Sequence, residues 1–310
     1  MPAGPRVHVV HENPEWLPPF RAALEAEAVP FEEILLTSGS IDLDAEPAPG
    51  VYWSRLSASA HTRDHALAKE YARALLGGLE RSGRRVVGGG GVLELEVSKA
   101  RQHAALRAAG LDVPRTVAVF GRELLSRRAR EFAPPFIAKH NQGGKGLGVR
   151  RFDSHAEFDD YAASALFEEP ADGITLLQEH LVAAEPFVTR AEFVGGRFVY
   201  AVRVDISTGG FELCPADACV IDPVSGAEIA AFSLRPGLDD DPLIARYEAF
   251  LAANGIEIAG IEFMETSDGR RVTYDVNTTT NYNAGVEASA ELPAARAVAR
   301  FLGGLLRETG

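Results

Sequence analysis

Residues 258–277 predict a β-hairpin that sets two carboxylates opposite each other. The runs 258–266 and 271–277 flank Ser-Asp-Gly-Arg, and Asp-Gly is typical of a two-residue type I′ turn. Counting outward from that turn pairs Glu262 with Asp275, and Asn277 faces the same side two residues on. Opposed carboxylates repel unless a cation joins them, and oxygen ligands of this kind suit Mg²⁺. The alternative is an exposed edge with both acids in water, but the apolar neighbours favour the metal.

A second hairpin is predicted over 189–205, where a Gly-Gly pair separates two β-rich runs. With a two-residue turn, Val194 faces Arg197 and Arg190 faces Ala201. Arg190 and Arg203 then lie on one face as diagonal neighbours, where they could share an anion. A solvated basic face explains this hairpin equally well.

The stretch 136–149 predicts a short strand followed by a loop whose amides can fold around an anion. The apolar run ends at Lys139, and phosphates are natural partners for this lysine and for Lys145 in the loop. The four loop glycines are Gly143, Gly144, Gly146 and Gly148. The stretch fits neither the Walker A pattern nor Gly-x-Gly-x-x-Gly. A flexible glycine-rich hairpin is the alternative.

The first hundred residues alternate strand and helix patterns, which predicts a small α/β domain. Within it, the glycine run 88–91 indicates a strand-to-helix turn rather than a phosphate loop. His61 and His65 are better explained as a hydrogen-bonded or solvated pair than as metal ligands.

Two further segments have polar residues where elements begin or end. Ser98 is a good N-cap for a helix over 99–109, and Lys99 occupies its first turn, where the helix dipole disfavours a cation. A nearby ligand for Lys99 and a simple exposed lysine both remain open. The strand 174–178 leaves through Gln178, Glu179, His180 and Leu181, an exit that can offer backbone groups to a base edge.

Composition limits the class of protein. The 310 residues are enough for a substantial core and two or three subdomains. A net charge of −13 argues against a nucleic-acid partner, and no apolar run is long enough to span a membrane. The two cysteines, Cys214 and Cys219, are typical of a reducing compartment. A cytoplasmic protein is expected.

These motifs occur in the order found in the ATP-grasp ligases, and residues 97–310 resemble the RimK-like and glutathione-synthetase-like carboxylate–amine ligases of that superfamily. The resemblance implies a mixed α/β (α+β) ATP-grasp fold in three parts. These are an N-terminal α/β pre-grasp domain (1–97), a central subdomain with the glycine-rich lid loop (98–176) and a C-terminal subdomain with the metal site (177–310).

The resemblance also implies roles for individual residues. It assigns ATP to Lys99, Lys139, Gly143, Gly144, Lys145, Gly146, Gln178, Glu179, Leu181 and, at the ribose, Glu185. It assigns Mg²⁺, with Mn²⁺ as a substitute, to Glu262, Asp275 and Asn277. It assigns the acylphosphate to Arg203 and Arg190, and the substrates to Arg55, Ser57, Asn281 and Asn283. Family members commonly carry Asp first and Glu second in the metal pair, an order that this chain reverses with the same total charge.

The implied activity is an ATP-dependent condensation of a carboxylate with an amine through an acylphosphate, releasing ADP and phosphate. An amino acid joined to a small carboxylate or to a peptide is the expected product, and a homodimer is the family's habit. A phosphotransferase with the same nucleotide site is the main alternative. A non-catalytic nucleotide-binding subunit fits less well, because the metal set and both lysines are present.

Overall fold

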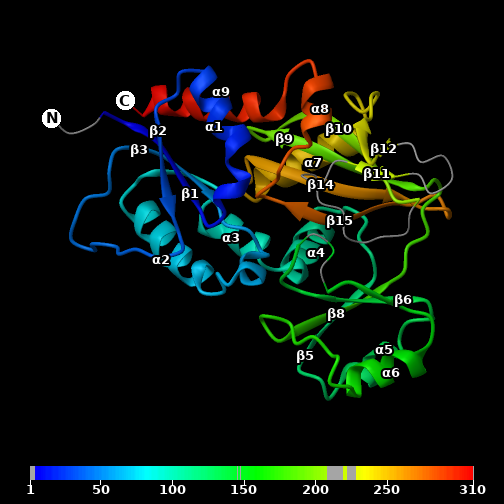
Figure 1. Ribbon diagram of the computed structural model, residues 1–310. Coiled ribbons are helices and arrows are strands. Elements are labelled where there is room, and N and C mark those ends of the chain that lie inside the picture. Colours follow the sequence, from blue (N-terminus) through cyan, green and yellow to red (C-terminus); the bar gives the residue numbers. More distant parts are fainter. Residues whose placement is uncertain (1–3, 145, 147, 208–218, 222–227, 310) are drawn as a thin grey trace.

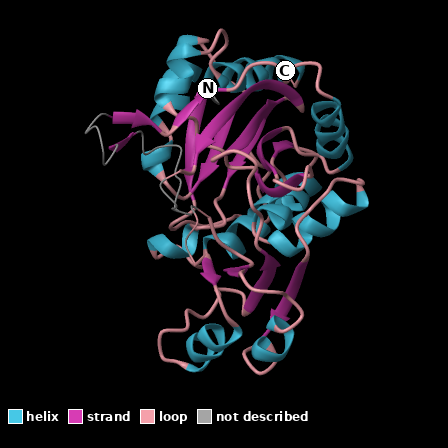
Figure 2. Cartoon of the chain, turned by 90° about the vertical axis from the view of Figure 1, so that its right-hand side faces the viewer, coloured by secondary structure: helices cyan, strands magenta, loops and turns pink. Residues whose placement is uncertain are grey.

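The computed structural model describes residues 4–144, 146, 148–207, 219–221 and 228–309. Three larger β-sheets organise this part of the chain (Figure 1). Figure 2 shows a large sheet at the top, a layer of helices below it and a further unit of strands and helices at the bottom. The mixed α/β class predicted from the sequence is confirmed.

The N-terminal sheet is parallel, with strand order β2-β1-β3-β4, which confirms the predicted strand–helix alternation. Its strands are β1 (Arg6–His11), β2 (Phe31–Leu35), β3 (Gly50–Arg55) and β4 (Arg85–Val87). The helices in this region are η1 (Pro14–Trp16), α1 (Pro18–Ala26), η2 (Ala60–Arg63), α2 (Ala68–Arg81) and α3 (Gly90–Glu96). The last helix of the chain, α9 (Ala294–Glu308), runs beside α1 and completes this core (Figure 1).

The central sheet is antiparallel, with strand order β5-β8-β6-β7, and forms the lower lobe in Figure 1. Its elements are β5 (Thr116–Phe120), α5 (Leu125–Ala129), β6 (Phe136–His140), β7 (Arg150–Phe152), α6 (His155–Ala163) and β8 (Ile174–Glu179). Phe136, Phe152 and Phe158 pack together beneath the sheet and anchor both helices to it. Helix α4 (Lys99–Ala108) leads into this lobe.

The C-terminal sheet has strand order β13-β10-β9-β14-β15. Its strands are β9 (Phe187–Val194), β10 (Arg197–Asp205), β13 (Phe232–Leu234), β14 (Ile258–Glu265) and β15 (Arg271–Asn277). Helix α7 (Pro242–Ala253) packs Tyr247 and Phe250 against one face of the sheet. The short helix α8 (Ala284–Ser289) lies against β13, and β11 (Cys219–Ile221) pairs with β12 (Glu228–Ala230) in a separate ribbon.

The hairpin of β14 and β15 confirms the predicted pairing of Glu262 with Asp275, but its turn and the register beside the turn differ from the prediction. The turn is a three-residue loop over 267–269, in which Gly269 has a φ of +85° and Thr266 N donates to Arg270 O at 2.9 Å. This shifts the register by one residue, and a bulge at Tyr274 shifts it back. The predicted type I′ turn is therefore wrong, although the predicted pairing of Glu262 with Asp275 is right.

The hairpin of β9 and β10 contradicts the predicted convergence of two arginines. Val194 pairs with Arg197 as expected, but a bulge after Phe198 makes Arg190 pair with Val202 and Arg203 with Thr189. One extra residue moves every later side chain of the strand to the opposite face. Arg190 and Arg203 therefore point to opposite sides of the sheet.

The subdomain boundaries stay a prediction, although 176/177 falls inside β8 and α9 lies with the N-terminal sheet. No helix among the described residues is both long and apolar enough to cross a bilayer.

Candidate active site

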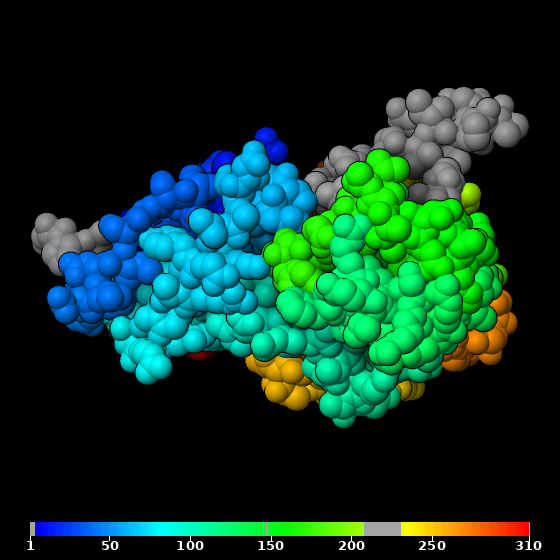
Figure 3. All heavy atoms as spheres, turned by 90° about the horizontal axis from the view of Figure 1, so that it is seen from below, coloured from blue at the N-terminus to red at the C-terminus, as the bar shows by residue number. Residues whose placement is uncertain are grey.

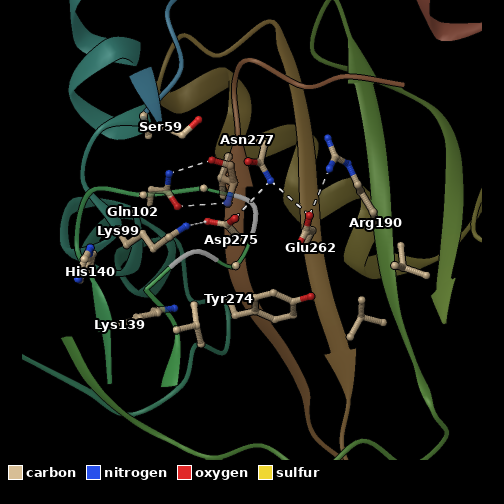
Figure 4. Close-up of a pocket in the computed structure, with 18 of the residues that line it drawn as sticks. Ser59, Lys99, Gln102, Lys139, His140, Arg190, Glu262, Tyr274, Asp275 and Asn277 are labelled. Atoms are coloured by element: carbon tan, nitrogen blue, oxygen red, sulfur yellow. Dashed lines mark hydrogen bonds and ion pairs between the residues drawn. The ribbon is translucent and has the colours of Figure 1, made fainter. Parts of the chain in front are cut away.

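A cavity of about 450 Å³ lies where the three sheets meet. Residues from all three parts line it, and Figure 4 shows the side chains that face into it. The predicted site residues that line it are Ser57, Lys99, Lys139, Gly143, Gly144, Gly146, Gln178, Glu179, Leu181, Arg190, Glu262, Asp275, Asn277 and Asn281. Residue 145 lies outside the described residues, as does Cys214.

Glu262, Asp275 and Asn277 form one cluster on the cavity wall (Figure 4). The Asn277 amide Nδ2 lies 3.4 Å from Glu262 Oε1 and 3.3 Å from Asp275 Oδ2. Burial raises the pKa of Glu262, and Arg190 only partly offsets this. Two carboxylates and an amide at this spacing are a donor set that a hard divalent cation prefers, so these residues fit Mg²⁺.

Two cations already pair with the two acids. Lys99 Nζ contacts Asp275, and Arg190 Nη1 lies 3.3 Å from Glu262 Oε1 (Figure 4). Burial raises the pKa of Asp275, but Lys99 outweighs it, so the net pKa is lowered. Burial likewise lowers the pKa of Lys99, but Asp275 and Glu262 outweigh it and the net pKa is raised.

Lys99 is placed by the N-cap that the sequence predicted. Ser98 Oγ accepts a hydrogen bond from Arg101 N and starts α4. Asn141, just after β6, holds the same helix end, since its Oδ1 accepts from Ala100 N at 2.8 Å. A residue of the central sheet thereby fixes the helix that carries Lys99. Of the two possibilities that the sequence left open, Lys99 is a cavity residue.

Lys139 lies near Lys99, at the end of β6, and is buried. Burial and the charge of Lys99 lower the pKa of Lys139 to about 7. A phosphate beside the two lysines would relieve this repulsion and restore the second positive charge.

Helix α4 is docked on β15 by side chains that the sequence analysis missed. The Gln102 Nε2 group donates to Val276 O at 2.8 Å, and Gln102 Oε1 accepts from Val276 N at 3.2 Å. The side chain thus imitates a neighbouring strand (Figure 4). His103 lies 3.3 Å from Tyr274 O, and burial lowers its pKa to about 3. In the sequence, the adjacent polar residues Gln102 and His103 within the predicted helix were the feature that could have indicated this contact.

Arg190 is held in a second network that the sequence did not predict. Its Nε donates to Glu192 at 2.6 Å, and its Nη2 donates to Thr280 Oγ1. Glu192 and Thr280 are both buried. Gly260 leaves the room for this guanidinium, because a Cβ there would lie 2.7 Å from Arg190 Nε. The arginine is therefore fixed in place, with further N–H groups available to the cavity.

The glycine-rich loop begins against the N-terminal domain. Gln142 Nε2 donates to Ala58 O at 3.2 Å, and Lys69 donates to Gln142 Oε1 at 2.7 Å. A side chain on Gly144 would contact Ser59 at 3.5 Å. Figure 3 shows the blue-to-cyan and green parts of the chain meeting side by side. Gly143, Gly144 and Gly146 of the loop line the cavity.

The strand exit 178–181 also lines the cavity. Gln178 is buried, and its Oε1 has no hydrogen-bond partner among the described residues. Glu179 N already donates to Arg115 O at 3.0 Å, so that N–H is not available to a base. The side-chain oxygen of Gln178 is an acceptor that the sequence analysis overlooked.

Arg203 and Glu185 are not among the described residues that line the cavity, so their predicted roles stay predictions. The Arg203 guanidinium stacks on the Phe187 ring at 3.9 Å and lies 3.9 Å from Glu185. Both side chains are well exposed. The bulge in β10 explains this for Arg203, because it turns that side chain to the other face of the sheet.

Arg55 and Asn283 are not among the described residues that line the cavity. Arg55 is buried over Phe20 and Trp53, and its Nη2 donates to Asn281 Oδ1 at 2.8 Å. Arg55 therefore orients Asn281, which does line the cavity. Asn283 caps α8 by accepting from the amides of Gly285 and Val286.

The structure also shows the surroundings of two other motifs. The glycine run opens α3, and Gly90 N donates to Glu80 at 2.7 Å, as expected for a strand-to-helix turn. His61 lies 3.1 Å from Ala58 O, and His65 pairs with Glu12. No cluster of three or more His, Cys, Asp or Glu residues suited to a metal occurs among the described residues.

The chain is similar to known proteins in sequence and in structure. No protein-family model matches the chain. A probable alpha-L-glutamate ligase of Xanthomonas oryzae pv. oryzae (strain MAFF 311018) is 28% identical over 221 residues, which are 66% of this chain and 63% of that protein. The chain thus spans less than two thirds of the length of this relative.

Solved structures match over nearly the whole chain. The ATP-grasp ligase PsnB, complexed with minimal precursor, superposes with a TM-score of 0.68 at 17% identity over 99% of this chain and all of that one. An ATP-grasp RimK domain protein from Sphaerobacter thermophilus DSM 20745 gives a TM-score of 0.67 at 18% identity, covering 96% and 98% of the two chains. The chain has the ATP-grasp fold. The resemblance inferred from its motifs is confirmed, and the proteins it is similar to are ligases.

Proposed function

We propose that this chain is an ATP-dependent carboxylate–amine ligase that forms an amide or peptide bond and releases ADP and phosphate. The observation that carries the proposal is the cluster of Glu262, Asp275 and Asn277, which shares one cavity with Lys99 and Lys139. The ATP-grasp fold and the ligase relative support it.

The proposed nucleotide site extends from Lys99 and Lys139 to the strand exit 178–181. Lys99 and Lys139 hold the phosphates, and the glycine-rich loop covers them and excludes water. At the other end, Gln178 Oε1 can accept a hydrogen bond from an amino group of the base. The PsnB ligase has been solved with Mg and ADP, which supports these two ligands for the fold.

The metal would bind Glu262, Asp275 and Asn277 and would supply charge neutralisation at the phosphates. Lys99 would then exchange its contact with Asp275 for a phosphate. Mg²⁺ is the proposed ion, and Mn²⁺ is a convenient substitute in experiments.

The proposed reaction has two balanced steps. A carboxylate oxygen attacks the γ-phosphorus of ATP, ADP leaves, and an acylphosphate forms. The amine nitrogen then attacks the acyl carbon, phosphate leaves, and the nitrogen loses a proton to solvent. Arg190 is a fixed cation 3.3 Å from Glu262, and its remaining N–H groups would stabilise the negative charge of both steps.

The substrates are proposed to enter beside Ser57 and Asn281, which line the cavity. PsnB has been solved with precursor peptides, and the curated relative is a probable glutamate ligase. We therefore propose a peptide or a small carboxylate and amine as substrates. The expected homodimer stays a prediction that light scattering would test.

Mass spectrometry of the purified protein with Mg-ATP and a pool of amino acids, short peptides and carboxylic acids tests the proposal. ADP together with a product equal to two pool members less water would establish a ligase and identify both substrates. ADP together with a pool member heavier by one phosphoryl group would overturn the ligase proposal in favour of a phosphotransferase.

A further inference from the structure

Glu96 is a buried carboxylate in the lining of the cavity, and the proposed mechanism does not use it. It is the last residue of α3, and only 7% of its surface is exposed. No ion pair joins it to a lysine or arginine among the described residues. A buried acid is costly unless hydrogen bonds satisfy it, so its partners explain why it is there.

The Glu96 carboxylate accepts four hydrogen bonds from two distant loops. Oε2 accepts from Thr278 N and from Thr278 Oγ1, each at 2.8 Å. Oε1 accepts from Thr279 Oγ1 at 2.9 Å and from Ala58 N at 3.3 Å. One side chain thus ties the loop after β3 to the loop after β15.

The loop after β15 follows directly on Asn277, the last residue of the metal cluster along the chain. Thr278 follows Asn277 directly, so a grip on both the amide and the hydroxyl of Thr278 fixes the backbone that orients Asn277. The contacts of the Asn277 side chain with the two acids are long, at 3.3 and 3.4 Å, and do not hold it by themselves.

The same loop also reaches Arg190. Thr280 Oγ1 accepts from Arg190 Nη2 and donates to Glu192 Oε2 at 3.0 Å. Fixing Thr278 and Thr279 therefore limits where Thr280 can lie against Arg190. Contacts made by such outer residues commonly set the position of metal ligands.

We propose that Glu96 is a positioning residue of the metal cluster, which acts through Thr278 on Asn277 and through Thr279 and Thr280 on Arg190. This rests on the proposed metal–nucleotide function and adds to it a residue that touches neither ligand in that scheme.

Glu96→Gln is a sharp test because it keeps the volume and removes one acceptor oxygen. In either orientation the new NH₂ group faces a backbone N–H, that of Thr278 or that of Ala58, which can only donate. Thr278→Val and Thr278→Ser form a matched pair: the first loses the hydroxyl at nearly constant volume and the second keeps it. Thr278 is buried and does not line the cavity, so an effect must pass through Glu96 and the backbone.

Isothermal titration calorimetry with Mn²⁺ in saturating ADP, and with ADP alone in EDTA, supplies the readout. Mn²⁺ affinity should fall about tenfold in Glu96→Gln and about fivefold in Thr278→Val, and should stay within about twofold of the parent in Thr278→Ser. ADP affinity without metal should change less than about twofold in all three, because Lys99 and Lys139 are untouched.

Unchanged Mn²⁺ affinity in Glu96→Gln and Thr278→Val would overturn the inference, as would an equal loss in Thr278→Ser. An equal loss of metal-free ADP binding would overturn it too, since Glu96 would then support the fold in general. If Glu96→Gln does not fold, the Thr278 pair decides. Absence of Mn²⁺ binding with ADP in the parent protein would instead defeat the proposed function.

Discussion

Arg190 and Arg203 lie on adjacent strands, yet only Arg190 lines the cavity. Arg190 is gripped by Glu192, Glu262 and Thr280, whereas Arg203 is exposed on Phe187. Sequence counting placed them together because it assumed an unbroken ladder. A bulge after Phe198 has no signature that such counting uses.

Conservative substitution of the two arginines should separate their roles. Arg190→Lys should lower turnover by about 10- to 100-fold, because a lysine cannot keep three separate contacts and still serve an anion. Arg203→Lys should stay within about threefold of the parent. ADP release with the substrate pair found by mass spectrometry measures both. A larger loss at Arg203 would restore the role that the sequence assigned to it.

His103 should make stability depend on pH. Its pKa in the folded protein is about 3 because it is buried beside Lys139, whereas the ordinary value is 6.5. Between those values the unfolded chain binds a proton that the folded chain does not. Stability should therefore fall by up to about 1.4 kcal/mol per pH unit as pH drops below about 6.5.

His103→Gln retains a donor for Tyr274 O and removes the titrating group. Its loss of unfolding free energy between pH 7.5 and 5.5 should be smaller than that of the parent, by roughly 1 kcal/mol. Urea unfolding at the two pH values measures this. Equal losses in both proteins would show that other groups govern the acid sensitivity.

At the scale of elements, α4 joins the two halves of the site because Gln102 pairs with the edge of β15. The sequence predicted the helix, its Ser98 cap and the stop at Gly110, since these depend on neighbours along the chain. It could not predict where the helix docks, because Gln102 meets its partners only in the folded protein. The burial of Glu96 could have been predicted, because it lies on the same helix face as the apolar residues Val92 and Leu93.

Gln102→Ala should destabilise the protein by about 2–4 kcal/mol, because it strands the backbone groups of Val276 and Leu95 inside the core. Arg101→Ala, on the exposed face of the same helix, should cost less than about 1 kcal/mol. Chemical denaturation compares them. Similar costs at the two positions would mean that solvent replaces the Gln102 contacts.

At the scale of the whole molecule, the chain closes on itself. Helix α9 packs in the core of the N-terminal sheet with α1, β1 and β3 (Figure 1). The sequence predicted the mixed α/β class, but a division into three consecutive parts does not predict that α9 returns to the first sheet. Contacts between chain ends leave no local pattern to read.

Leu302, fully buried on α9, should couple the C-terminus to the first sheet. Leu302→Ala should lower stability by about 2–5 kcal/mol. Arg300→Ala, half-exposed on the same helix, is the control and should cost under about 1 kcal/mol. Fluorescence of Trp53, in the same core, reports unfolding. An undisturbed Trp53 transition in Leu302→Ala would show that the two regions unfold separately.

The most direct test of the metal cluster on which the proposed function rests is calorimetry of ADP binding with and without Mg²⁺. In the parent protein Mg²⁺ should tighten ADP binding by about tenfold or more, and Glu262→Gln should remove most of that gain. Glu265→Gln, on the same strand but outside the cavity lining, should keep it. The account would be contradicted if Mg²⁺ left the ADP affinity of the parent protein unchanged. It would also be contradicted if Glu262→Gln kept the full increase in ADP affinity that Mg²⁺ produces.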